Sequence, residues 1–265
     1  MTMTDPGPVL PDHEGVKTTR RVLLGMLTPS SNTVVEPVTT AMVADLPEVS
    51  VHFSRFPVTE ITLSDEALAQ FEPGRILAAA KLLAQARVAV ITWNGTSAAW
   101  KGFASDDDLC RQITAETGIP AASSVLAMNE IFAATGVRRI GLVTPYLEAV
   151  QERIIASYTA AGYHCVAERH ENDPGNFSYS EIGEDLIAQR IREVATAQPD
   201  AIAVVCTNLF GARVAAVMEA ETGIPVYDTV ATGLWKSLVL AGIDTARVTG
   251  WGTLFKTRLN NLPSA

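Results

Sequence analysis

The sequence has few of the residues that hold metal ions or disulfides. Its three cysteines, Cys110, Cys165 and Cys206, are widely spaced, and its four histidines form no HxxxH or HExxH pattern. Scattered cysteines in an odd number argue against a disulfide framework and suit a reducing compartment. No pair has the spacing of metal ligands. We therefore expect a cytoplasmic protein with no metal site.

Long hydrophobic runs and clusters of basic residues are also absent. No apolar run reaches the about 18 residues that suggest a transmembrane helix. Residues 1–20 are polar and contain prolines instead of the apolar core of a signal peptide, so we expect a flexible leader there. The net charge is −9 and no Lys/Arg run occurs. Neither nucleic acid nor an anionic membrane surface is therefore expected as a partner.

The common nucleotide and nucleophile motifs are missing as well. The chain contains no GxGxxG, no P-loop and no GxSxG sequence. Its composition, 48% hydrophobic and 18% charged, is that of an ordinary globular protein. We therefore expect a folded protein that works without a cofactor.

Short apolar runs alternate with segments of helical spacing. Uninterrupted runs of this kind are typical of parallel strands covered on both faces. The expected strands are residues 21–27, 49–56, 88–93, 120–123, 138–143, 163–169, 201–206 and 225–227. The clearest helical spacing covers residues 65–86, 148–161 and 181–196. The alternation predicts βα units and an α/β fold with parallel sheets.

An internal repeat divides the chain into two parts. Residues 25–29 (GMLTP) resemble residues 141–145 (GLVTP), and residues 116–120 and 221–225 are both ETGIP. Between these pairs, Gly95 matches Cys206 at the ends of two expected strands. The repeat predicts two similar doubly wound parallel-sheet halves, residues 21–135 and 136–265, related by a pseudo-twofold axis. Ligands bind beyond the carboxyl ends of such strands, so we expect the active site between the halves.

Four polar loops follow the expected strands, and each has two interpretations. Their Ser, Thr and Asn side chains could simply cap helices, or they could join free N–H groups in binding an anion. The glycine in the second loop would let the backbone approach a ligand closely. The candidate residues are Pro29, Ser30 and Asn32 in the first loop, Gly95, Thr96 and Ser97 in the second, Tyr146 in the third, and Cys206 and Thr207 in the fourth.

Cys206 is the candidate with chemistry of its own. A lone cysteine after an apolar strand is usually an inert buried residue. The repeat, however, places Cys206 at a strand end that faces the expected cleft, and a thiol at a helix N-terminus tends to have a lowered pKa. The acidic run at residues 106–108 is expected to start a solvated helix, and Asp228 to hold a loop by hydrogen bonds.

Taken together, these loops resemble the aspartate/glutamate racemase superfamily. Within it, the chain is most similar to the arylmalonate decarboxylases and the maleate cis–trans isomerases. The resemblance runs from about Arg21 to Phe255. It rests on residues 25–32 (GMLTPSSN), 94–97 (NGTS), 143–146 (VTPY) followed by Glu152-Arg153, Cys206, and 250–255 (GWGTLF).

The resemblance implies a reaction and roles for several residues. Racemases and maleate isomerases of this superfamily use two cysteines, and the first would fall at Gly95 here. A Gly-Thr-Ser loop with one cysteine in the second half is the arrangement of the arylmalonate decarboxylases. It implies that Thr96, Ser97, Tyr146 and backbone amides bind substrate carboxylates, and that Cys206 protonates the carbanion left by decarboxylation.

Two departures leave alternatives open. The decarboxylases have Cys-Gly-Gly where this chain has Cys206-Thr207-Asn208, and residues 30–32 look more like the isomerases. Arg55, in another isomerase-like segment, would be a natural carboxylate partner. We therefore expect a cofactor-independent decarboxylase of a substituted malonate. A maleate isomerase or Asp/Glu-type racemase of a small dicarboxylate, and an inactive carboxylate-binding relative, remain alternatives. The partner is a small carboxylate in each case, and assembly into a homo-oligomer stays open.

Overall fold

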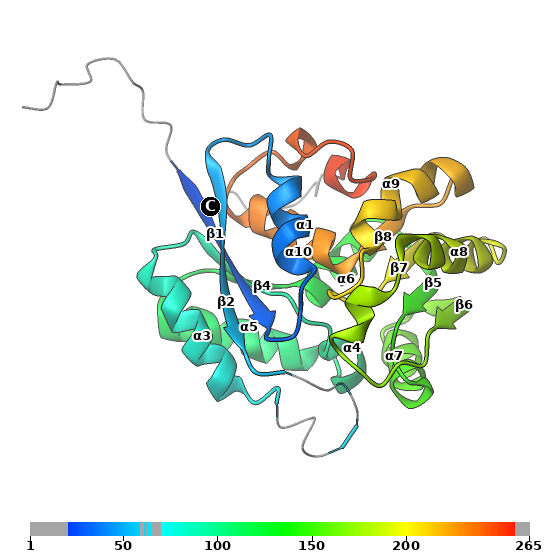
Figure 1. The fold of residues 1–265 in the computed structure, drawn as a ribbon, viewed down its shortest axis with the longest axis horizontal. Coiled ribbons are helices and arrows are strands. Elements are labelled where there is room, and N and C mark those ends of the chain that lie inside the picture. The colour runs from blue at the N-terminus through cyan, green and yellow to red at the C-terminus, as the bar shows by residue number, and fades with distance from the viewer. Residues whose placement is uncertain (1–20, 59–60, 62, 65–69, 258–265) are drawn as a thin grey trace, which may run out of the picture.

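Two four-stranded parallel sheets form the framework of the computed structural model (Figure 1). The structure describes residues 21–58, 61, 63–64 and 70–257. The expected leader (1–20), part of the expected helix 65–86 (residues 65–69) and the end of the second half (258–265) lie outside the described residues.

The first sheet is built from the first half of the chain. Its strand order is β2 (Val49–Phe56), β1 (Val22–Pro29), β3 (Val90–Trp93) and β4 (Ala121–Ser123), and all neighbours are parallel. The helices in the described part of this half are α1 (Val35–Met42), α3 (Pro73–Gln85), α4 (Ala98–Lys101), α5 (Ala104–Thr117) and α6 (Ser124–Thr135). Helices α3 and α5 pack on each other and on the sheet, α3 against β1 and β2 and α5 against β4.

The second sheet repeats this topology. Its strand order is β6 (His164–His170), β5 (Arg139–Thr144), β7 (Ala201–Val204) and β8 (Val226–Asp228), again all parallel. The helices here are α7 (Glu148–Ala160), α8 (Glu184–Ala195), α9 (Gly211–Thr222) and α10 (Thr229–Leu240). The predicted α/β fold with two similar parallel-sheet halves is confirmed.

Local sequence signals set several helix ends. The hydroxyl of Ser123 accepts the N–H of Leu126 at the start of α6, and the Asp228 carboxylate accepts two N–H groups at the start of α10. Helix α3 begins later than predicted, at Pro73, because proline fits the first helical turn and disfavours a helical residue before it. The predicted strand 201–206 ends early, at Val204, so Cys206 lies in the loop beyond β7.

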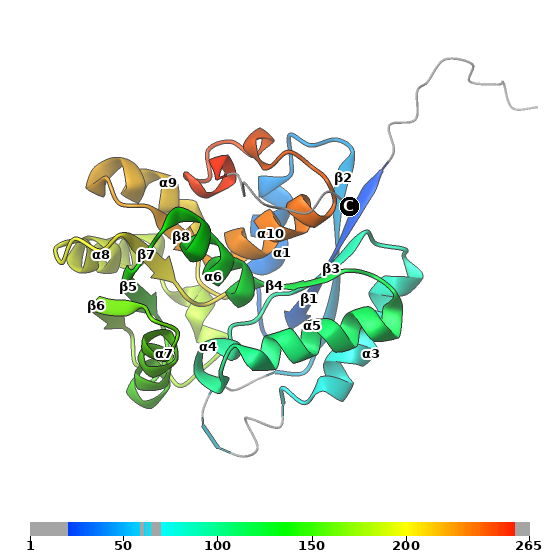
Figure 2. The same cartoon turned by 180° about the vertical axis from the view of Figure 1, so that it is seen from behind.

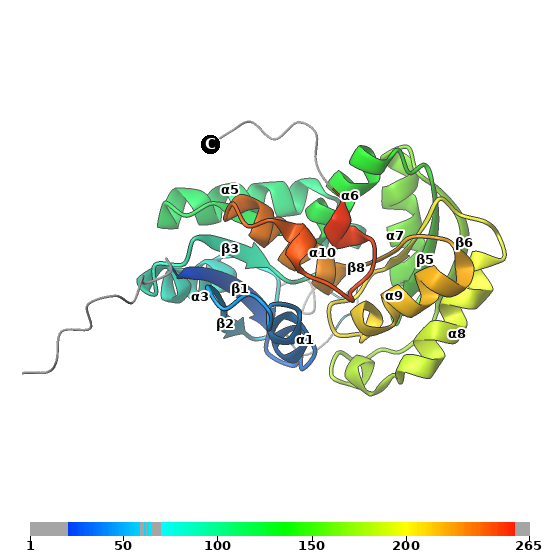
Figure 3. The same ribbon diagram turned by 90° about the horizontal axis from the view of Figure 1, so that it is seen from above.

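Helices α6 and α10 lie side by side between the two sheets (Figures 2 and 3). Helix α10 also contacts β3 and β4 of the first sheet, where the hydroxyls of Thr92 and Ser237 lie 2.6 Å apart in the interior. The buried side chains of both halves form one continuous hydrophobic core. The loops that follow β1, β3, β5 and β7 are therefore held in fixed positions relative to one another. Among the described residues, no helix is both long and apolar enough to cross a membrane.

Candidate functional site

One small cavity lies where the loops after β1, β3, β5 and β7 meet. Its lining residues are Pro29, Asn32, Ile61, Phe71, Gly95, Thr96, Trp100, Tyr146, Asn176, Cys206, Thr207 and Asn208. The polar groups of this described lining are hydroxyls, amides and one thiol, and none of them is a charged side chain. The volume is about 20 Å³, which is room for about one water molecule. A carboxylate bound here would meet neutral hydrogen-bond donors, and side chains would have to move to admit it.

Cys206 is almost fully buried in this lining, and its thiol is held in the protonated form. Burial raises its pKa to about 12, although the Tyr146 hydroxyl and the N–H of Asn208 act in the opposite direction. That N–H lies 3.4 Å from Sγ. The expectation of a lowered pKa is therefore wrong for this structure. Helix α9 begins only at Gly211, so the thiol lies outside its first turn, and burial penalises the thiolate.

Tyr146 and Thr96 reach the cavity from opposite halves and bond to each other. Their hydroxyl oxygens lie 2.6 Å apart, and both side chains are buried. Burial raises the pKa of Tyr146 well above its usual range, so the phenol keeps its proton. The two hydroxyls carry two hydrogens, of which one lies between them. The pair therefore has one O–H left to donate to a ligand or to the neighbouring thiol.

Side chains of Asn32 and Thr207 tie the first and fourth loops together across the cavity. The Asn32 amide donates to the Thr207 carbonyl at 2.9 Å and lies 3.3 Å from its hydroxyl, while its Oδ1 accepts the N–H groups of Val34 and Val35. The Thr207 hydroxyl in turn donates to the carbonyl of Asn94 in the second loop, at 3.1 Å. Asn32 thus serves both expected purposes, capping the start of α1 and lining the cavity.

Three predicted site residues lie outside this cavity. Ser97 is buried in the lining of a separate cavity of about 210 Å³ that also includes Lys101 and Asp106. The Ser30 hydroxyl accepts the N–H of Val58 at 3.1 Å instead of facing the thiol.

Arg55 is also directed elsewhere. Its guanidinium pairs with Glu36 at 2.8 Å and donates to the carbonyls of Ser30 and Asn32 at 2.9 Å. The structure therefore assigns Arg55 to fixing the first loop and does not bring it to the Cys206 cavity. Among the described residues, no group of three or more His, Cys, Asp or Glu side chains is arranged to hold a metal ion.

Several lining residues flank the predicted loops and are not among the predicted site residues. Asn176 follows β6, its amide donates to Val58 and Ser31 of the other half, and its carbonyl accepts from Asn208 at 2.6 Å. The repeat contained a signal for it. Asn176 and Ile61 both line the cavity and are 115 residues apart. The same offset separates His52 in β2 from Ala167 in β6. His52 pairs with Gly25 of β1, and Ala167 pairs with the equivalent Gly141 of β5.

Trp100 and Phe71 form the apolar part of the lining. The Trp100 ring packs edge-on against Tyr146 at 5.1 Å and against Phe71 at 6.2 Å. Its indole N–H is buried and has no hydrogen-bond partner in the described part of the chain. An apolar wall beside neutral donors is a suitable place to leave a carboxylate poorly solvated.

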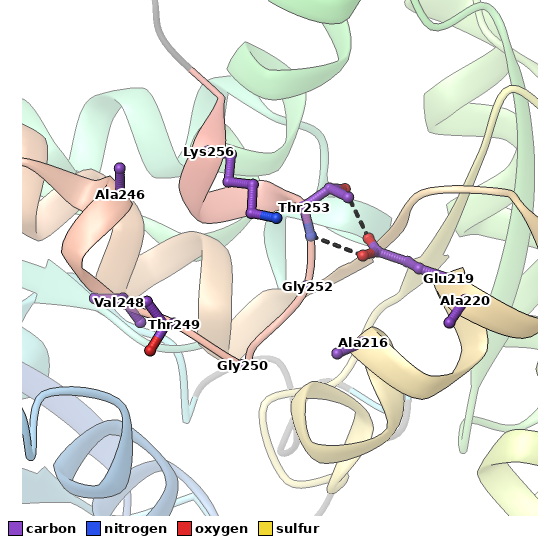
Figure 4. Close-up of a pocket in the computed structure, with 10 residues that line it drawn as sticks. All are labelled: Ala216, Glu219, Ala220, Ala246, Val248, Thr249, Gly250, Gly252, Thr253 and Lys256. Carbon is purple, nitrogen blue, oxygen red and sulfur yellow. Dashed lines mark hydrogen bonds between the residues drawn. The ribbon is translucent and has the colours of Figure 1, made fainter.

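A larger cavity, of about 480 Å³, lies elsewhere, between α9 and the C-terminal segment (Figure 4). A carboxylate of its described lining, Glu219, accepts the N–H and the hydroxyl of Thr253 and the N–H of Val226. Gly250, Gly252 and Thr253, from the segment 250–255 that contributes to the resemblance, line this cavity and not the Cys206 cavity. Glu219 therefore fixes this segment against α9.

Comparison with known proteins places the chain among enzymes. Residues 24–255 match the family described as arylmalonate decarboxylase. The arylmalonate decarboxylase of Bordetella bronchiseptica is 26% identical over 179 residues, which are 66% of this chain and 75% of that protein. The maleate isomerase of Nocardia farcinica is 26% identical over 240 residues, which are 88% of this chain and 95% of that protein.

The fold is shared with solved structures of the same groups. The crystal structure of the maleate isomerase Iso from Pseudomonas putida superposes with a TM-score of 0.80 at 25% identity, over 88% of this chain and 98% of that one. The two-sheet architecture is therefore that of maleate isomerase and arylmalonate decarboxylase structures.

Proposed function

The chain belongs to the arylmalonate decarboxylase family, a family of enzymes that includes decarboxylases and isomerases, and from this we propose that it decarboxylates a substituted malonate without a cofactor. The observation that carries the proposal is the single thiol of the cavity. Cys206 lines it, whereas the equivalent position in the first half is Gly95, and Cys110 and Cys165 lie elsewhere. A thiol whose pKa is raised to about 12 is protonated at neutral pH, so Cys206 holds a proton that it can transfer.

The proposed reaction has two steps. The bond from the α-carbon to one carboxylate breaks, CO2 leaves, and the electron pair passes into an enediolate formed with the remaining carboxylate. Cys206 then transfers its S–H proton to the α-carbon, and the thiolate regains a proton from water. One acid delivers the proton to one face of the planar intermediate, so the product is a single enantiomer.

The free O–H of the Thr96–Tyr146 pair supports the first step. The developing enediolate carries more negative charge on oxygen than the bound carboxylate, and a fixed donor stabilises that charge. A good donor of this type contributes about 3–4 kcal/mol to the transition state. Phe71 and Trp100 give the departing carboxylate an apolar neighbourhood.

A second candidate function is cis–trans isomerisation of a small dicarboxylate such as maleate. The isomerase relatives match a larger share of the chain than the decarboxylase relative does. The first loop, whose Asn32 lines the cavity, also has the isomerase-like sequence. In that reaction Cys206 would act as a nucleophile, and its thiol would first have to lose the proton that burial favours.

Turnover assays separate the two candidates. Phenylmalonate, maleate, aspartate and glutamate are each incubated with the wild type, with Cys206→Ala and with Cys165→Ala, a control at a half-buried cysteine of β6. We expect CO2 release from phenylmalonate, a loss of about 10²–10⁴-fold in Cys206→Ala, and unchanged turnover in Cys165→Ala. Fumarate formed from maleate without CO2 would establish the isomerase. Binding of these acids without turnover would point to an inactive relative.

A further inference from the structure

The indole ring of Trp93 occupies the place where a side chain at residue 95 would begin. A Cβ atom added to Gly95 would lie 1.9 Å from Cζ2, 2.3 Å from Cη2 and 2.4 Å from Cε2 of Trp93, whereas real Cβ contacts essentially never fall below 3.0 Å. Gly95 is not among the glycines with a positive φ. Glycine is therefore required here for space and not for its backbone conformation.

Trp93 is packed on the side of Phe56 and also lines the cavity of about 210 Å³ that Ser97 lines. Its side chain is fully buried at the end of β3, and its ring packs against Phe56 of β2 with the centroids 5.3 Å apart. A side chain at residue 95 would force the ring to give up its contact with Phe56 and to shift toward that cavity, which costs packing energy. Any residue other than glycine at position 95 therefore conflicts with the indole.

In the second half, the position equivalent to Gly95 carries a side chain, that of Cys206. Strand β7 ends at Val204 as β3 ends at Trp93, and Cys206 follows Val204 by two residues as Gly95 follows Trp93. Val204 is also fully buried. Beside this smaller side chain the loop carries a thiol that lines the cavity. The size of the last strand residue thus distinguishes the half that carries an acid from the half that does not.

We infer that Trp93 restricts proton delivery to the face served by Cys206, because its indole prevents the first half from carrying a second acid. Gly95 and Cys206 come from different sheets and line the same cavity. A thiol at each position would hold the α-carbon between two acids, which is the arrangement that lets a proton leave one face and return to the other. Trp93 is therefore the residue that excludes a second acid at position 95. This inference rests on the proposed decarboxylation.

The test transfers the arrangement of the second half into the first. Gly95→Cys is made alone and together with Trp93→Val, which reproduces the Val204–Cys206 pair. Gly95→Cys alone should lower Tm by about 5 °C or more and should leave the product a single enantiomer. The double variant should form a mixture of enantiomers, and it should exchange the α-proton of the purified product in D2O. Trp93→Val alone should keep a single enantiomer.

A stability measurement tests the steric part without relying on turnover. Gly95→Ala should lower Tm clearly in the wild type and much less in the Trp93→Val background, with Trp93→Leu as the second background if the valine variant does not fold. Equal losses in both backgrounds, or racemisation by Gly95→Cys alone, would overturn the inference. If Gly95→Ala lowers Tm more in the wild type than in the Trp93→Val background but the wild type releases no CO2, the proposed function is wrong and the steric part of the inference is not.

Discussion

The hydroxyl oxygens of Thr96 and Tyr146 lie 2.6 Å apart, although one residue follows a strand of the first sheet and the other a strand of the second. The hydrogen bond joins the two halves inside the cavity that Cys206 lines. One O–H of the pair is left over to donate to a ligand. The proposed oxyanion donor therefore depends on the packing of the two halves against each other, because one hydroxyl of the pair comes from each half.

Removing the phenolic hydroxyl tests this donor. Tyr146→Phe keeps the ring contacts with Trp100 and Tyr179 and should lower kcat by about 10²–10³-fold, with a smaller change in KM. The matched control is Tyr158→Phe, a buried tyrosine of α7 whose hydroxyl donates weakly to the sulfur of Met128, at 3.9 Å. Thr96→Ser should retain most of the activity that Thr96→Val loses. Unchanged kcat in Tyr146→Phe would remove the pair from the mechanism.

The raised pKa of Cys206 predicts how its alkylation depends on pH. Only the thiolate reacts with iodoacetamide, and with a pKa of about 12 the logarithm of the rate should rise by about one per pH unit from pH 7 to 9.5 without levelling off. The rate is followed by mass mapping of the peptide that contains Cys206, with glutathione as the reference thiol. Levelling off below pH 9 would indicate a stabilised thiolate and would favour a nucleophilic role.

The two uses of Asn32 can be separated by stability measurements. Asn32→Ala removes the cap of α1 and the bond to Thr207, and should lower the free energy of unfolding by about 2–3 kcal/mol. Asn32→Ser can still cap but cannot reach across, so it should recover only the capping part. Urea denaturation of the three proteins measures both parts. Equal stability of the serine variant and the wild type would mean that the contact between the loops contributes nothing.

Asp106 predicts a loss of stability as the pH rises. Burial raises its pKa to about 7, although Ser123 donates a hydrogen bond to it. Below about pH 4 the carboxyl is protonated in both the folded and the unfolded state. Between about pH 4 and 7 the unfolded state loses the proton first, so folding becomes less favourable, by roughly 4 kcal/mol at most.

Asp106→Asn should remove this dependence and narrow the difference in unfolding free energy between pH 5 and pH 7.5. Asp107→Asn, at the exposed neighbouring position, is the control and should leave the difference unchanged. Urea denaturation at the two pH values checks the prediction. An unaltered difference in Asp106→Asn would place the titration elsewhere, for example at Asp228, whose pKa burial also raises to about 7.

Asp106 shows where the sequence interpretation failed. Residues 106–108 were expected to start a solvated helix, but only Asp107 and Asp108 are exposed. Asp106 shares the buried side of α5 with Leu109 and Ile113, at the three- and four-residue spacing of one helix face. The spacing was visible in the sequence.

The sequence by itself determined the architecture, because a parallel strand covered on both faces needs an uninterrupted apolar run, and the repeat of such runs with their loops specified two matching sheets. The same repeat located Gly95 and Cys206 at equivalent strand ends. These features depend on neighbouring residues along the chain, so they can be read from the chain.

Only the tertiary structure decided what each loop residue faces. Ser97 lines another cavity, and Arg55 pairs with Glu36. Asn176, from a segment with no predicted role, lines the Cys206 cavity. The tertiary structure also raised the pKa of Cys206, because burial and not position near a helix governs the cost of a thiolate there. These outcomes depend on how the two halves pack against each other and on the volume of buried side chains such as Trp93. Both are determined jointly by residues that are distant from one another in the chain.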